Sequence, residues 1–111
     1  MAHSPRLVFV TASSLEEARK LAQAILEKHL AVCVNLAPKL ESHYWWQGKL
    51  EIEEEVLLVI KSSAEQFEAL AEEIRQEHCY TCPEIVSVAT QEISPEYRAW
   101  WEKEMVVEAS K

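Results

Sequence analysis

The only glycine of the 111-residue chain is Gly48, and it divides a long segment with strand composition into two arms. The segment covers residues 39–62, and a tight reversal at its centre needs the positive φ that glycine adopts without strain. In the second arm, apolar and acidic residues alternate over residues 50–53, and the chain is wholly apolar over residues 56–60. The sequence therefore predicts a long β-hairpin whose tip projects past the domain and lies against another surface.

Apolar runs and helical periodicities account for most of the remaining chain. Runs rich in β-branched residues predict strands over residues 6–12, 30–37 and 84–93, and the second run is expected to stop at Pro38. Helical spacing of apolar residues predicts helices within residues 13–29, 63–78 and 94–105. The first two helices are expected to begin with capping boxes, formed by Ser14 with Glu17 and by Ser63 with Gln66.

The order βαβ, hairpin, βαβ and terminal helix predicts an α+β fold of the ferredoxin-like, or split βαβ, type. Right-handed crossovers would place the two main helices on one face of an antiparallel sheet. The last helix has an apolar face and would cover part of the other: Tyr97, Trp100, Trp101 and Met105. The length fits a single domain, 1–111, whose small core cannot absorb four tryptophans. Symmetric association of copies is therefore expected to cover the rest of the sheet.

Charge and composition exclude several classes of function. Acidic residues outnumber basic ones by 19 to 11, and a net charge of -8 repels a phosphate backbone, so no nucleic-acid partner is expected. No apolar run approaches the roughly 18 residues that span a membrane, and the strand-length apolar stretch near the start does not predict a signal peptide. Three cysteines cannot form a closed set of disulfides, which is typical of a reducing, cytoplasmic location. No catalytic motif occurs, so neither an enzyme nor an organic cofactor is expected.

Metal-ligating side chains cluster at residues 77–84, which read EHCYTCPE. A closed zinc site needs four ligands, and the chain has no second set to complete one. Redox cysteines use a helix N-terminus, whereas these follow a helix C-terminus, where the dipole disfavours a thiolate. Two interpretations stay open. In the first, His78 with Glu77, Cys79 or Cys82 forms an open site for copper or, second, zinc. In the second, the segment is a half-buried loop.

Five stretches, in order along nearly the whole chain, resemble the CutA divalent cation tolerance family: LAVCVNL, YWWQGKLE, EVLLVIKS, HCYTCPEIV and SPEYRAWW. The resemblance implies a ferredoxin-like subunit in a tight homotrimer similar to the PII proteins, with the hairpins lying against neighbouring subunits. It also implies a non-enzymatic role in tolerance of copper and other divalent ions.

The resemblance further implies where copper ligands would lie. In bacterial members, copper binding is associated with a cysteine late in the first strand and with two consecutive histidines before a Pro-Tyr pair. The cysteine position is Val10 in this chain, the histidine pair is Glu77-His78, and Cys79 replaces the proline. One of the three family ligands is therefore retained, and the cysteines of the HCYTC stretch are candidate substitutes.

A second function is implied by the residues that line the family's groove between subunits. Lys61, Tyr80 and Glu84 match the usual types at these positions. From the sequence alone, Lys61 is either a solvated strand end or a charge that faces a cleft. A trimer with such grooves could sense a small anionic metabolite, so the alternative function is that of a PII-like signalling module.

Overall fold

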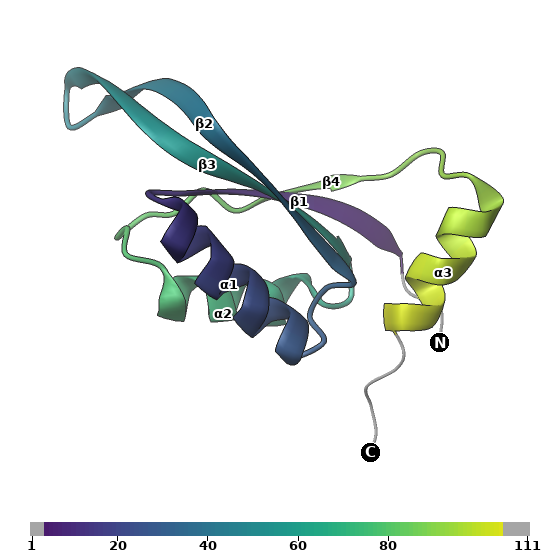
Figure 1. Cartoon of the computed structure of the whole chain (residues 1–111). Helices are drawn as coiled ribbons and strands as arrows, with labels where there is room; N and C mark the ends of the chain where they lie inside the picture. Colours follow the sequence, from purple (N-terminus) through teal and green to yellow (C-terminus); the bar gives the residue numbers. More distant parts are fainter. Residues whose placement is uncertain (1–3, 106–111) are drawn as a thin grey trace.

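A computed structural model of the chain describes residues 4–105 and places four strands in one antiparallel sheet with three helices (Figure 1). The elements, in chain order, are β1 (Pro5–Ala12), α1 (Leu15–Glu27), β2 (Cys33–Trp46), β3 (Lys49–Ser63), α2 (Phe67–Glu77), β4 (Val86–Ala89) and α3 (Pro95–Met105). The strand order is β2-β3-β1-β4. The open sheet with two helices on one face confirms the predicted split βαβ plan. No helix within residues 4–105 is long and apolar enough to cross a membrane.

The core lies between the sheet and the pair α1 and α2, which run side by side on one face (Figure 1). Alternation along β1 and β3 directs every second side chain to this face. Its largest contributors are fully buried: Val8, Val10, Leu21, Ile25, Leu58, Ile60, Leu70 and Ile74. Each buried aliphatic side chain of this size contributes about 1.5–3 kcal/mol to folding.

The predicted hairpin is present, and its turn has the expected geometry. Gln47 and Gly48 both have positive φ, at 50° and 81°, and Trp46 pairs with Lys49 across the reversal. Positive φ at both central residues matches the twist of the flanking strands. The hairpin extends well past the helical layer (Figure 1).

The predicted end of the second strand at Pro38 is wrong, because β2 continues to Trp46. Pro38 lies within a register shift between Ala37 and Leu40, and Lys39 has a φ of 65°. Proline lacks an N–H, but β2 is an edge strand, and a bulge removes the need for regular pairing at this point. Because of the bulge, β2 continues beyond Pro38, although a proline normally ends a strand.

The start of α1 at Ser14 was predicted, whereas α2 begins at Phe67 and not directly after the predicted cap Ser63. The Glu17 amide donates to Ser14 Oγ at 3.0 Å, whereas the Glu17 carboxylate is hydrogen-bonded elsewhere. At α2, the Gln66 amide donates to Ser63 Oγ at 3.1 Å, but the Gln66 side chain makes no capping bond. The carboxylate of Glu17 is therefore not used to cap α1 and is available for other contacts.

The last strand is shorter than predicted, and the last helix buries less of its apolar face than predicted. β4 covers only Val86–Ala89 of the expected 84–93 and pairs with residues 6–9 of β1. On α3, Trp101 and Met105 are buried, whereas Tyr97 and Trp100 are each 38% exposed. The second face of the sheet and the hairpin therefore leave large apolar side chains in solvent: Trp45, Leu50, Ile52, Val86 and Val88.

Candidate functional site

His78 follows α2 directly, and its buried ring is fixed by two backbone groups. Nε2 lies 2.7 Å from the Thr11 carbonyl oxygen, and Nδ1 lies 3.0 Å from the Tyr80 amide nitrogen. An amide can only donate and a carbonyl can only accept, so Nδ1 is the acceptor and Nε2 carries the hydrogen. The ring is therefore held in one neutral tautomer, with the lone pair of Nδ1 facing residues 79–80.

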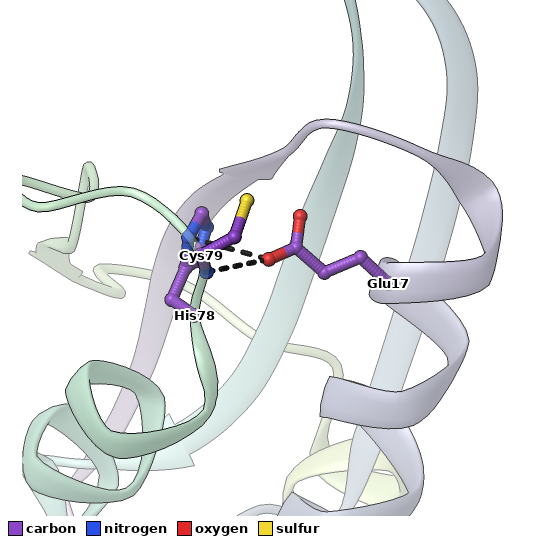
Figure 2. A group of neighbouring side chains, drawn as sticks. All are labelled: Glu17, His78 and Cys79. Atoms are coloured by element: carbon purple, nitrogen blue, oxygen red, sulfur yellow. Dashed lines mark hydrogen bonds and ion pairs between the residues drawn. The ribbon is translucent and has the colours of Figure 1, made fainter.

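Glu17 approaches this ring from the first turn of α1, and one of its carboxylate oxygens lies 3.5 Å from His78 Nδ1 (Figure 2). The carboxylate also accepts hydrogen bonds from the amides of Ser13, at 2.9 Å, and Cys79, at 2.8 Å. Burial raises the pKa of Glu17, but these backbone bonds outweigh it and lower the pKa to about 2. Glu17 therefore ties the start of α1 to the loop after α2 as a stable anion.

Cys79 completes the group with an exposed thiol whose Sγ lies 3.6 Å from Ser13 Oγ. The Ser13 hydroxyl lowers the pKa of Cys79, but burial and the nearby Glu17 carboxylate outweigh it and raise the pKa overall. The thiol is therefore protonated at neutral pH. A metal ion would have to displace that proton, as is usual for cysteine ligands.

Glu17, His78 and Cys79 form what we call the metal-ligand cluster, since one oxygen, one nitrogen and one sulfur all lie within 4.8 Å of one another. Within residues 4–105 it is the only group of three or more metal-ligating side chains with this spacing. Of the predicted ligands, Glu77 lines the same shallow depression as Cys79 and Glu17, whereas Cys82 lines a different pocket. The structure thus unites two of the predicted residues with an unpredicted third.

The family cysteine position supplies no ligand in this chain. Val10 lies in β1 with its side chain fully buried in the core. The third member of the cluster, Glu17, lies on α1, 61 residues before His78 in the sequence. No local pattern could therefore predict their contact. The only sequence signal was the serine-to-glutamate spacing at the helix start, which predicts a cap and not a ligand.

A pocket with a volume of about 520 Å³ lies between the hairpin and the loop that connects α2 to β4. We call it the acidic pocket, because four glutamates and three aromatic side chains line it: Glu51, Glu53, Glu55, Glu84, Tyr44, Trp46 and Tyr80. It also includes Thr11, Thr81 and Cys82. Its negative charge disfavours the small anionic ligand that the groove residues suggested.

Tyr80 connects the acidic pocket with the metal-ligand cluster. Its hydroxyl lies 2.7 Å from a Glu55 carboxylate oxygen, and its ring centroid lies 4.7 Å from that of His78. Burial, followed by the Glu55 carboxylate, raises the pKa of Tyr80. Burial and Glu55 also raise the pKa of Glu84. Both shifts indicate a pocket in which added negative charge is unfavourable.

Lys61 lies apart from Tyr80 and Glu84 in the single chain. Its Nζ donates to Asn35 Oδ1 at 3.0 Å, lies 3.9 Å from Cys33 Sγ, and stands 5.4 Å from the ring centroid of Tyr97. The Tyr97 side chain is the main cause that raises the pKa of Lys61. The three groove residues therefore do not form one site within a protomer.

The hydrogen bonds to Glu17 predict a measurable dependence of stability on pH. The Glu17 side chain is only 14% exposed, and a pKa lowered from 4.5 to about 2 corresponds to up to about 3 kcal/mol of folding free energy at pH 7. This contribution is complete above the unfolded pKa and is lost as the pH falls from about 5 to about 2. Glu17→Gln should lose it at every pH, as measured by urea unfolding in metal-free buffer.

Glu16→Gln is the matched control, since it removes the same charge from the same helical turn at an exposed position. The control should change the unfolding free energy by less than about 0.5 kcal/mol. If the two variants lose equal stability at pH 7, the effect comes from the helix dipole and not from the contacts of Glu17.

The chain is similar to known proteins over most of its length. Residues 6–104 match the family described as CutA1 divalent ion tolerance protein. The divalent-cation tolerance protein CutA of Thermus thermophilus is 42% identical over 94 residues, covering 85% of this chain and 91% of its own. The corresponding protein of Archaeoglobus fulgidus is 38% identical over 93 residues, covering 84% and 90%.

Solved structures give the same result for the fold. The crystal structure of CutA1 from Oryza sativa matches with a TM-score of 0.90 at 32% identity, covering 96% of this chain and 98% of that one. The Thermus thermophilus protein matches with a TM-score of 0.87 at 39% identity, covering 90% and 97%. The similarity therefore extends over nearly the whole fold.

Proposed function

This chain belongs to the CutA1 divalent ion tolerance family, and from that premise we propose that it acts in divalent cation tolerance by binding a transition metal ion without catalysing a reaction. The observation that carries this proposal is the metal-ligand cluster, in which Glu17, His78 and Cys79 converge within 4.8 Å. Copper is the first choice of metal and zinc the second, because a mixed set of nitrogen, oxygen and sulfur donors suits both.

The residues present fit such an ion with one adjustment. Glu17 is already ionised, and Cys79 is exposed, so one side of the cluster is open to solvent. The lone pair of His78 Nδ1 is held by the Tyr80 amide, which would have to give up that hydrogen bond. The ion would supply positive charge among these donors and displace the thiol proton.

Loss of the Cys79 thiol should weaken metal binding strongly. Cys79→Ala removes one of the three protein donors at an exposed position, where folding is not at risk. We expect Zn²⁺ or anaerobic Cu⁺ to bind at least about tenfold to a hundredfold more weakly, in isothermal titration calorimetry on protein without a histidine tag. His78→Ala should also weaken binding, but it removes two buried hydrogen bonds as well.

Cys82→Ala is the control, because it deletes a second exposed thiol only three residues away that lines the acidic pocket instead. Its affinity for metal should match that of the unmodified protein. Should Cys82→Ala weaken binding as much as Cys79→Ala, the ion would be held by the cysteine pair and Glu17 would not be a ligand.

We also propose that three copies associate through the uncovered sheet face and the hairpin. The support is the family resemblance together with the large apolar side chains that a single chain leaves in solvent. Trp45 is 70% exposed, and Leu50 and Ile52 lie beside it on the same side of the hairpin. Apolar patches of this kind mark association surfaces in soluble proteins.

A further inference from the structure

The Ser13 hydroxyl contacts two members of the metal-ligand cluster with a single oxygen atom. Its Oγ donates to Glu17 Oε1 at 2.9 Å and lies 3.6 Å from Cys79 Sγ. A hydroxyl has one hydrogen and two lone pairs, so one oxygen can hold both groups at once. These contacts lie within one chain and do not depend on how copies associate. Ser13 thus joins the oxygen donor of the cluster to the sulfur donor.

The carboxylate of Glu17 is oriented because its two oxygens have separate partners. Oε1 accepts hydrogen bonds from both the amide and the hydroxyl of Ser13, each at 2.9 Å. Oε2 accepts from the Cys79 amide at 2.8 Å and lies 3.5 Å from His78 Nδ1. The terminal torsion of a glutamate is broad, so the carboxylate turns easily when it is not held. The bonds from Ser13 therefore keep the second oxygen directed at the histidine.

The pair formed by Glu17 Oε2 and His78 Nδ1 favours a cation. Nδ1 presents a lone pair, and the ionised carboxylate carries no hydrogen, so two acceptors face each other at 3.5 Å. Cys79 Sγ completes the set of ligand atoms within 4.8 Å. This arrangement is favourable with a positive ion and unfavourable without one. The residue that maintains it therefore acts on the affinity of the cluster.

An ion that meets freely rotating side chains must restrict them on binding, which weakens its affinity. Hydrogen-bonded groups that orient metal ligands are commonly worth about tenfold to a hundredfold in affinity for this reason. We propose that Ser13 is a positioning residue whose hydroxyl orients Glu17 and Cys79 for the metal ion. This inference rests on the function proposed above and adds to it a residue that is not itself a ligand.

Isothermal titration calorimetry with Zn²⁺ tests this role. Ser13→Ala removes the hydroxyl but keeps the amide bond to Glu17, and we expect Zn²⁺ to bind about tenfold more weakly. Ser13→Thr keeps a hydroxyl at this exposed position, so its affinity should return to within about threefold of the unmodified protein. In a Cys79→Ala background, Ser13→Ala should cost less affinity, because one of the two contacts of the hydroxyl is already lost.

Ser14→Ala is the matched control, because the neighbouring hydroxyl caps α1 through the Glu17 amide and not through a ligand atom. It should lower the urea midpoint of unfolding but leave the affinity for Zn²⁺ within about twofold. Equal losses of affinity in Ser13→Ala and Ser14→Ala would overturn the positioning role, since the start of α1 would then be the cause. A Ser13→Thr variant that binds as weakly as Ser13→Ala would overturn it as well.

Two further results separate this inference from the proposed function. If Cys79→Ala weakens binding and Ser13→Ala does not, the metal site stands and the positioning role of Ser13 is overturned. If the unmodified protein binds neither Zn²⁺ nor anaerobic Cu⁺ at millimolar concentration, the proposed function is overturned and the role of Ser13 with it.

Discussion

Replacing Ile52 with aspartate is expected to convert the proposed trimer into single chains. Ile52 is 64% exposed on the hairpin, on the side that carries Trp45 and Leu50. In an assembly that covers this side, each copy would bury a carboxylate without a partner, at a cost of roughly 3 to 5 kcal/mol per copy. Light scattering at micromolar concentration should give the mass of one chain for Ile52→Asp and three times that mass for the unmodified protein.

Gln23→Glu provides the comparison for this experiment. It adds one negative charge at an exposed position of α1, on the helical layer away from the hairpin. The control should keep the mass of the unmodified protein. A monomeric and well-folded parent chain would contradict the trimer itself, while an Ile52→Asp variant with unchanged mass would remove this side of the hairpin from the interface.

Replacing Trp101 with alanine is expected to lower the free energy of unfolding by about 3 to 5 kcal/mol. Trp101 is only 3% exposed, and its Nε1 donates to the Ser62 carbonyl oxygen at 2.8 Å. The variant would leave a cavity beneath α3 and would deprive a buried carbonyl of its donor. Chemical denaturation at fixed protein concentration measures the loss.

Trp100→Ala, one residue earlier on the same helix, separates this burial from a general effect of removing an indole. Trp100 is 38% exposed and stacks on Tyr97 at 5.2 Å between ring centroids, so its loss should cost about 1 kcal/mol. If the two variants prove equally unstable, Trp101 is not the residue that anchors α3.

The fold followed from the sequence wherever the signal was local. The lone Gly48 between two strand-like arms predicted the hairpin, and the spacing of apolar residues predicted all three helices. The prediction was wrong at Pro38, because a proline ends a regular strand but not one that bulges at a sheet edge. The length of β4 was overestimated for another reason: it depends on where pairing with β1 ends, which composition does not express.

Only part of the candidate site could be predicted from the sequence, for a related reason. His78 and Cys79 are neighbours along the chain, so their types and spacing could be read directly. Glu17 joins them through the packing of α1 beside the loop after α2, a contact that no local pattern encodes. The acidic pocket likewise depends on Glu55 meeting Tyr80 across 25 residues. Long-range packing, and not residue type, decides which acidic groups gather.

The irregularity at Pro38 also affects whether other strands can pair with the exposed edge of β2. A straight edge of 14 residues would offer unsatisfied amides and carbonyls to any other strand and invite open-ended fibre growth. Pro38 has no amide hydrogen to donate at this edge. The adjacent bulge twists the strand, and Lys39 adds a positive charge to it. Open-ended addition of further strands at this edge is thereby disfavoured.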